Sequence, residues 1–301
     1  MKAFVTGGSG FMGLSLANKL LSQGHKVKIL DLKEPEIKHK NLEFVKKSVV
    51  NEIKDDIKGS DILFHFAALL GVENSDKMPL ETMRINLEGS VNVFKSAMEA
   101  NVKDIIFSSS SEVYGNPREL PIKEDSVKGP ISTYGVSKLA AEIYAKAYNH
   151  ECGSSIKIAR FFNVYGPRQS NNFVVPIFID NALQNKPIKV FGNGSQTRCF
   201  TYVDDAIDGI FKVVEKGKTG EAYNIGNNHP TTILQLAETI KELANSKSEI
   251  IKVDFGKNTR TKEREIDYRI PDISKMNALG WEPRIRIVEG IKKILEWKRN
   301  N

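Results

Sequence analysis

The sequence predicts an α/β protein built on a doubly wound parallel sheet, with a smaller α/β lobe after it. Three observations predict this class. Short β-rich runs alternate with amphipathic helices over the first two thirds of the chain, a glycine-rich turn follows the first run, and loops rich in Asn, Gly and Pro become frequent from about Phe173 onward. Strands that alternate with helices form βαβ units, which require parallel pairing and right-handed crossovers.

The expected elements follow one another in the order that such units require. A strand over Lys2–Thr6 leads into a helix over about Phe11–Gln23, whose apolar residues recur at helical spacing. Further strands are expected at Val27–Leu30, Asp61–Phe66, Asp104–Ser108, Ser155–Arg160 and Ala222–Ile225, and further helices over about Pro79–Asn101 and Ser132–Asn149. The run at 222–225 is expected to return to the sheet, so residues 1–170 with 200–228 form one domain, and 171–199 with 229–301 form the second lobe.

The composition is that of an ordinary globular protein. The 301 residues carry 44 Lys and Arg against 37 Asp and Glu, a net charge of +7, and 40% of them are hydrophobic, which excludes disordered and fibrous chains. Basic residues are scattered among acidic ones, so no nucleic-acid surface is expected. No metal site is expected either. No apolar run reaches the roughly 18 residues of a membrane helix. With no secretory signal expected and only Cys152 and Cys199 present, we expect a cytoplasmic protein without a disulfide framework.

The strongest local signal is the glycine-rich turn Thr6–Gly13, which follows the first strand and opens the first helix. Gly7, Gly10 and Gly13 allow a tight turn and a close approach of the backbone to a pyrophosphate, which would lie at the helix N-terminus. Asp31 ends the second strand, 18 residues beyond Gly13, where a carboxylate accepts hydrogen bonds from an adenosine ribose and repels a 2′-phosphate. The turn and the acid together predict NAD rather than NADP, whereas either alone would also suit a turn without a ligand.

A tyrosine and a lysine four residues apart form a second candidate site. Tyr134 and Lys138 lie near the start of a predicted helix, so their side chains share one face. A tyrosine acts as a base near neutral pH where a cation lowers its pKa, which Lys138 can do, although one such spacing is expected by chance. The run Ser108–Ser111 follows a buried-type strand at the edge where open sheets bind ligands. A hydroxyl of this run can hydrogen bond a substrate oxygen, with a solvated loop as the alternative.

With these motifs the chain resembles the extended short-chain dehydrogenase/reductases, in particular the NAD-dependent sugar-nucleotide epimerases and dehydratases, and most of all the UDP-glucose 4-epimerases. The resemblance runs nearly from end to end, through the segments Thr6–Gly13, His65–Ala68, Asn86 with Gly89, Ser108–Gly115, Tyr134–Lys138, Arg160–Arg168, Gly192–Asp205, Pro271–Lys275 and Leu279–Trp281. It implies a Rossmann-type fold, NAD as cofactor and a nucleotide-diphosphate sugar as substrate, with a UDP-sugar expected. It also implies a homodimer formed through the helices near 79–100 and 132–149, although the apolar residues of the first helix would equally pack on the sheet.

The resemblance implies roles for residues at matching positions. Tyr134 would remove the proton of the sugar 4-hydroxyl while a hydride passes from C4 to the nicotinamide. Lys138 would lower the pKa of this tyrosine and hold the nicotinamide ribose, and Ser110 would bridge the 4-oxygen and the tyrosine. The positions expected to contact the cofactor are Gly7, Gly10, Phe11, Met12, Gly13, Asp31, Ala67, Asn86, Tyr134 and Lys138. Those expected to contact the substrate are Ser110, Glu112, Asn163, Arg198 and Arg269, with Arg168 and either Arg260 or Arg264 as further candidates for the diphosphate.

Three departures from the family pattern bear on the reaction. The 4,6-dehydratases carry Asp-Glu where this chain has Ser111 and Glu112, so the acid that would eliminate water is missing. Leu69-Leu70 stands where hexose 4-epimerases often have a lysine, and Arg269 stands where some of them have a tyrosine, serine or cysteine. UDP-glucuronate decarboxylases resemble the chain at Glu112 and Arg269, but other epimerase-like sequences do so as well.

We therefore expect a UDP-hexose 4-epimerase that oxidises the sugar transiently at C4. The alternatives are a UDP-glucuronate decarboxylase, another sugar-nucleotide dehydratase or reductase, and a non-catalytic NAD-binding protein. The presence of Ser110, Tyr134 and Lys138 together argues against the last of these, because a site that has lost its activity usually loses one of its catalytic residues.

Overall fold

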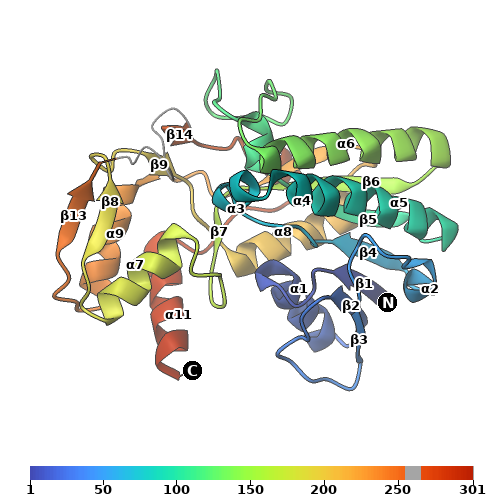
Figure 1. Ribbon diagram of the computed structural model, residues 1–301, viewed down its shortest axis with the longest axis horizontal. Coiled ribbons are helices and arrows are strands. Elements are labelled where there is room, and N and C mark those ends of the chain that lie inside the picture. The colour runs from blue at the N-terminus through green and yellow to red at the C-terminus, as the bar shows by residue number, and fades with distance from the viewer. Residues whose placement is uncertain (255–265, 301) are drawn as a thin grey trace.

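The chain folds around a seven-stranded sheet, with a smaller lobe beside it (Figure 1). The computed structural model describes residues 1–254 and 266–300, without the side chains of 72–74. In spatial order the strands are β11 (Ala222–Ile225), β6 (Ser155–Phe161), β5 (Asp104–Ser110), β4 (Ile62–His65), β1 (Lys2–Thr6), β2 (Lys26–Asp31) and β3 (Leu42–Lys46). Every neighbouring pair in this sheet is parallel, and the strand order reverses at β1. This topology confirms the predicted doubly wound, Rossmann-type fold.

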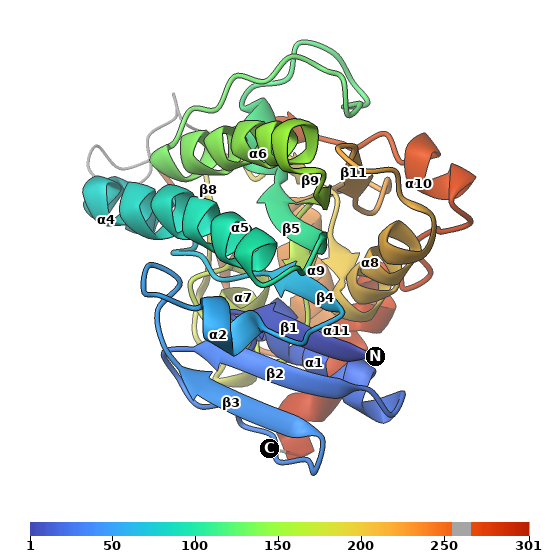
Figure 2. The same cartoon turned by 90° about the vertical axis from the view of Figure 1, so that its right-hand side faces the viewer.

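Helices cover both faces of the sheet, because its central strands are buried on both sides (Figure 2). One face carries α2 (Lys54–Ile57), α3 (Val72–Lys77), α4 (Pro79–Met83), α5 (Gly89–Glu99) and α6 (Thr133–Cys152), and the other carries α1 (Phe11–Ser22) and α8 (Val203–Lys216). Phe94 of α5 and Ala141 of α6 belong to the same core cluster as Leu63 in the first layer, and Leu16 of α1 and Ile207 of α8 belong to the core of the second. The apolar residues of these helices therefore lie mainly on the side that faces the sheet.

The helix expected over Pro79–Asn101 is not continuous. A π-helical turn, η1 (Arg84–Glu88), separates α4 from α5. The turn directs Asn86 inward, where its Oδ1 accepts the N–H of Leu69 at 2.7 Å and its Nδ2 donates to the carbonyl of Leu69 at 3.1 Å. Helix widening of this kind is a local adjustment that often marks functional sites, and here it ties the segment after β4 to the helix layer.

The second lobe is built mainly from α7 (Val174–Leu183), α9 (Ile233–Leu243), α11 (Ile287–Asn300) and the parallel pair β8 (Ile188–Phe191) and β13 (Ile250–Val253). Figure 1 shows these elements on the left, away from the large sheet. The remaining short elements are the turn η2 (Ser111–Tyr114), the helix α10 (Ser274–Ala278) and the strands β7 (Val164–Tyr165), β9 (Thr197–Arg198), β10 (Thr201–Tyr202), β12 (Thr231–Thr232) and β14 (Tyr268–Arg269). The strand β11 pairs with β6 in the large sheet, while the exact domain boundaries stay a prediction.

Within the described part of the chain, no helix combines the length and apolarity that crossing a membrane requires. The same residues contain no group of three or more His, Cys, Asp or Glu side chains that could hold a metal ion. Cys152 is exposed and Cys199 is buried, and both are free thiols.

Candidate active site

A cavity of about 550 Å³ lies where the carboxyl ends of β1, β5 and β6 face the smaller lobe. Among the described residues, six buried side-chain polar atoms lack a hydrogen-bond partner, and five of these belong to residues that line this cavity: Ser9, Asn163, Tyr165, Gln169 and Arg269. Buried polar atoms in proteins are nearly always paired, with a protein group, water or a ligand. Their concentration in one place, at the sheet edge where doubly wound folds bind ligands, marks the cavity as the candidate active site.

The glycine turn forms one wall of the cavity, with Phe11 and Met12 beside it. Gly7 has a φ of +68°, and a Cβ on it would lie 2.5 Å from the backbone nitrogen of Ala67. A Cβ on Gly13 would lie 2.2 Å from the carbonyl oxygen of Gly7, so neither position accepts a side chain without displacing backbone. Helix α1 begins directly after the turn and has no side-chain cap, which leaves its first N–H groups available for an anion. These residues fit the pyrophosphate of NAD.

Asp31 ends β2 and is tied to the turn. One oxygen of its carboxylate accepts the N–H of Ser9 at 3.0 Å, and the other accepts the N–H of Lys33 at 3.1 Å. Asp31 itself does not line the described cavity, whereas Ser9 does, with its unpartnered hydroxyl. The carboxylate keeps further lone pairs free, so its predicted bond to the adenosine ribose stays a prediction.

Ala67 and Asn86 support the cavity from behind. The N–H of Ala67 donates to the Thr6 hydroxyl at 3.3 Å, and its backbone packs against Gly7. Asn86 is fully buried and holds Leu69 in both directions. Neither lines the described cavity, so their contact with the cofactor stays a prediction.

Tyr134, Lys138 and Ser110 come together at the end of β5. The Ser132 hydroxyl caps the start of α6 by accepting the N–H of Gly135 at 3.1 Å. Tyr134, in the first turn of this helix, lies at the cavity wall. The Ser110 side chain lies close enough to Tyr134 to lower its pKa, and its hydroxyl accepts the N–H of Glu112 at 3.2 Å. Lys138 is buried behind Tyr134, where its Nζ lies 5.9 Å from the centre of the tyrosine ring and donates to the carbonyl of Ser108 at 2.7 Å. The structure thus brings the three predicted catalytic residues together.

Burial disfavours the charged forms of both Tyr134 and Lys138, whereas a catalytic base and its activating cation need those charged forms. The pKa of Tyr134 is raised, chiefly because burial disfavours the phenolate and also because Glu112 is nearby, while the Ser110 side chain lowers it. Burial lowers the pKa of Lys138 from 10.5 to about 7, and the negative charge of Glu142 partly opposes this. In the protein alone Lys138 is therefore poised to lose its proton well before Tyr134 does. A positive charge in the cavity would favour the phenolate.

Glu112 and Arg269 form an ion pair at the cavity wall, although 157 positions separate them. Glu112 lies in the turn η2, and Arg269 lies in β14. Arg269 is only 6% exposed, and its Nε has no partner among the described residues. Asn163 follows β6 with a φ of +40°, a conformation that asparagine tolerates, and its buried Nδ2 is likewise unpartnered. Both residues present free donors to a ligand.

The other predicted arginines lie in different places. Arg198 is not among the residues that line the described cavity, since its Nη1 donates to the carbonyls of Thr197 and Ile266 at 2.8 and 2.6 Å. Its role toward the diphosphate stays a prediction. Arg168 does line the cavity, where it pairs with Glu36 at 3.6 Å. Arg260 and Arg264 lie outside the described residues.

Several residues of the cavity were not predicted from the sequence. Ser9 and Gln169 each present an unpartnered polar atom, and Phe66, Phe173 and Phe200 supply much of the apolar wall. Ser9 lies inside the glycine turn and Gln169 directly follows the segment Arg160–Arg168, so their positions in recognised motifs were available as a signal. The phenylalanines offer no such signal, because apolar residues are common in both lobes.

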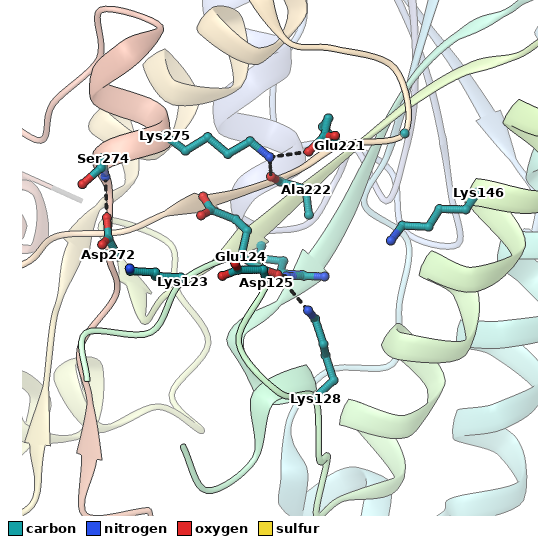
Figure 3. A pocket seen from close by; sticks show the side chains of 12 residues that line it. Lys123, Glu124, Asp125, Lys128, Lys146, Glu221, Ala222, Asp272, Ser274 and Lys275 are labelled. Atoms are coloured by element: carbon teal, nitrogen blue, oxygen red, sulfur yellow. Dashed lines mark hydrogen bonds and ion pairs between the residues drawn. The ribbon is translucent and has the colours of Figure 1, made fainter. Parts of the chain in front are cut away.

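A second cavity, of about 670 Å³, lies at the β11 edge of the sheet and has mostly charged walls (Figure 3). Two of its charged side chains hydrogen bond the backbone of the edge strand β11. Glu124 accepts the N–H of Asn224 at 2.9 Å, and Lys275 donates to the carbonyl of Ala222 at 2.7 Å. Lys128 in turn donates to the carbonyl of Glu124 at 2.9 Å. Covering the backbone of an edge strand prevents pairing with other chains. The larger cavity therefore has a structural explanation that the smaller one lacks.

Comparison with known proteins identifies the enzyme family. The model of the NAD dependent epimerase/dehydratase family matches residues 3–226. The UDP-N-acetyl-alpha-D-glucosaminuronate decarboxylase of Bacillus cytotoxicus is 33% identical over 316 residues, which cover 99% of this chain and 98% of the relative. The dTDP-D-glucose 4,6-dehydratase of Homo sapiens is 35% identical over 320 residues, covering 100% of this chain and 90% of the relative.

A solved structure also matches nearly the whole chain. The UDP-glucose 4-epimerase of Thermotoga maritima, determined with UDP-glucose, superposes with a TM-score of 0.93 at 31% identity, and the alignment covers 100% of this chain and 99% of that one. Three activities of one enzyme family thus match nearly the whole chain, which leaves the individual reaction open. The chain belongs to the NAD-dependent epimerase/dehydratase family of sugar-nucleotide enzymes, whose cofactor is NAD.

Proposed function

We propose that this protein is a 4-epimerase of a UDP-hexose that works by transient oxidation at C4. The observation that carries the proposal is the cluster of Tyr134, Ser110 and Lys138 at the wall of a cavity whose lining holds most of the unpartnered buried polar atoms. A base next to a hydroxyl donor suits the removal of a proton from an alcohol.

The residues divide the work as follows. Tyr134 takes the proton of the 4-hydroxyl as the C4–H bond breaks, and Ser110 holds the oxygen as it becomes a carbonyl. Bound NAD would supply the hydride acceptor and, once the keto sugar has turned over to present its other face, the hydride donor. Tyr134 then gives its proton back to the 4-oxygen, so the sugar regains both hydrogens with the configuration at C4 inverted. Lys138 supports the ionised tyrosine from behind, because its ammonium lies within 5.9 Å of the ring.

Elimination of water is disfavoured by the residue at position 111. Ser111 is buried at the end of β5 and cannot act as a carboxylic acid. Glu112 is the acidic residue beside it, and its charge is already paired with Arg269. This pairing supports epimerisation over dehydration.

The same ion pair favours a second candidate, the decarboxylation of a UDP-uronate. Arg269 lines the cavity with a free Nε, and a guanidinium binds a carboxylate through two parallel hydrogen bonds. A C6 carboxylate held there beside a 4-keto group would be a β-keto acid, which loses carbon dioxide readily. Glu112 would then lie near the carbon that takes up a proton.

Dimer formation is part of the proposal. Val136, Ile143 and Tyr144 on α6 are 43%, 62% and 47% exposed, and Leu80 on α4 is 86% exposed. Together they give the α4 and α6 layer an outward apolar surface, which supports its burial against a second copy. Analytical ultracentrifugation of the protein and of Ile143→Glu is the test, and we expect the variant to shift toward the monomer.

Proton NMR of the purified protein with UDP-glucose and with UDP-glucuronate, without added cofactor, tests the reaction itself. Conversion to the galacto isomer of either, with no loss of carbon, is the expected result. Release of carbon dioxide with appearance of a pentose would establish the second candidate instead. Tyr134→Phe is the control for each substrate, and no conversion in any tube would refute both candidates.

A further inference from the structure

Glu142 is a buried carboxylate directly behind the candidate catalytic residues. It follows Tyr134 by eight positions and Lys138 by four on α6, so the three side chains share one face of the helix. Glu142 is 2% exposed. A carboxylate is removed from water to this extent only where strong partners replace its hydration.

Its partners come from two strands of the large sheet. One oxygen accepts the Ser109 hydroxyl of β5 at 2.5 Å and the Nε of Arg160 of β6 at 2.9 Å, and the other accepts the Nη2 of Arg160 at 2.6 Å. Ser109 and Arg160 face each other in the strand register. Glu142 thus fastens α6 to β5 and β6 at one point.

That point lies in the middle of the reactive segment of β5. Ser108, on one side of Ser109, supplies the carbonyl that holds Lys138, and Ser110, on the other side, lies beside Tyr134 at the cavity wall. We propose that Glu142 is a positioning residue for the Tyr134–Lys138 pair, because through Ser109 it fixes the strand segment on which both residues depend. The inference rests on the proposed roles of Tyr134 and Lys138.

The negative charge of Glu142 also supports the Tyr134–Lys138 pair, because it favours the protonated form of Lys138. It raises the pKa of Lys138 against the larger lowering that burial causes. Without this charge, the pKa of Lys138 would fall further, and the ammonium would be lost at a lower pH. The groups around Lys138 are Tyr134 and Glu142 on its own helix and His65 on β4, with Arg160 on β6 next to Glu142 and Glu112 next to Tyr134.

A purely structural role would make different predictions. Arg160 is also held by the Tyr114 hydroxyl, to which its Nη1 donates at 2.7 Å, and by the carbonyl of Glu124 at 2.8 Å. If Glu142 served only to neutralise Arg160, loss of the Ser109 bond would leave that ion pair and the reaction intact. If Glu142 positions the reactive segment, loss of that one bond slows the reaction.

Ser109→Ala is the deciding variant, because it removes a hydroxyl without touching the ion pair. The readout is the single-turnover rate of hydride transfer in the NAD-loaded protein, followed by the absorbance of the reduced cofactor after mixing with whichever UDP-sugar the protein accepts. We expect a loss of roughly tenfold, the value of one hydrogen bond to a charged acceptor. The matched control is Ser154→Ala, which deletes a single part-buried bond from Ser154, just beyond the far end of α6, to Asn149 and should keep the rate.

Glu142→Gln tests the electrostatic part through the pH profile of the same rate. Its alkaline limb is expected to move to lower pH by roughly one unit, as Lys138 loses its neighbouring negative charge. An unshifted limb would overturn this part. If Glu142→Gln does not fold because Arg160 is left without its carboxylate, the test rests on Ser109→Ala. A wild-type rate in Ser109→Ala overturns the inference.

Tyr134→Phe separates the two proposals. A wild-type rate in Tyr134→Phe would refute the proposed function, whatever Ser109→Ala does. An inactive Tyr134→Phe together with a fully active Ser109→Ala would leave the proposed function in place and refute only the role of Glu142.

Discussion

Replacing Gly13 by alanine is expected to weaken NAD binding sharply, because the added methyl group has no room. A Cβ on Gly13 would lie 2.2 Å from the carbonyl oxygen of Gly7 and 2.8 Å from the Cα of Gly8, whereas ordinary contacts begin at 3.4 Å. The backbone of the turn must therefore move by about 1.2 Å, the difference between the first and the last of these distances. This is the backbone that cradles the pyrophosphate.

The size of the effect follows from two opposing terms. Forcing a methyl group against backbone costs about 3 kcal/mol, the upper end for overpacking, since neither neighbour is a flexible side chain. Alanine inside a helix gains about 1 kcal/mol over glycine, which leaves a net destabilisation of about 2 kcal/mol. Losing one backbone hydrogen bond to the charged pyrophosphate costs about 1.5–3 kcal/mol, which is roughly a tenfold to hundredfold loss of affinity, so NAD should be lost during purification.

The assay compares Gly13→Ala with Gly10→Ala, a matched change in the same turn. The nearest atom to a Cβ on Gly10 is the Gly7 carbonyl oxygen at 3.3 Å, so a small adjustment accommodates it. The NAD content of each purified protein is measured by chromatography of the extracted nucleotide, and thermal unfolding gives the stability. Equal NAD content in the two variants would refute the role of the close approach.

Three further outcomes are expected. Tyr134→Phe should keep bound NAD but lose turnover by roughly 10²–10⁴-fold, measured by proton NMR, and full activity would remove Tyr134 from the mechanism. Arg269→Met should lower kcat/KM for UDP-glucuronate roughly tenfold more than for UDP-glucose, because only the uronate offers a carboxylate to the guanidinium; equal losses would argue against that contact. Because burial lowers the pKa of Lys138 from 10.5 to about 7, the unfolded chain holds more protons between pH 7 and about 10, and the free energy of unfolding of the NAD-free protein should rise with pH across this range. Urea titrations test this rise, which Lys138→Met should flatten and whose absence in the wild type would contradict the shift.

The fold was predictable where the chain leaves a strong local pattern. The expected strands between Lys2 and Ile225 are mainly apolar, although β6 also buries Lys157 and Arg160, and all of them belong to the large sheet. The strand β3 was missed because it is an edge strand, whose five residues are half-buried or exposed and show no apolar run. The four-residue α2 and the two-residue strands of the smaller lobe are too short for any periodicity to appear.

The break in the helix after Met83 was also beyond the sequence pattern. The expected apolar stripe of Met83, Leu87, Val91, Phe94 and Met98 is fully buried only at Phe94, while the small and polar Asn86 and Ser90 are fully buried. Apolar spacing predicts the buried side of a helix from hydrophobicity alone. Here the hydrogen bonds of Asn86 with Leu69 outweigh that preference, and the helix widens to satisfy them.

Some features of the candidate site depend on residues close together in the sequence, and others depend on residues far apart. Tyr134 and Lys138 meet because they share a helix, and the glycine turn works because its residues are consecutive, so motifs reveal both. The Glu112–Arg269 pair joins positions 157 apart, and nothing local in the sequence specifies it. Such a pair bears on which reaction of the family a chain carries out, since it decides which charge the substrate must bring. We therefore expect substitutions at Glu112 and Arg269 to change the substrate preference, and substitutions at Tyr134 to change the rate for every substrate.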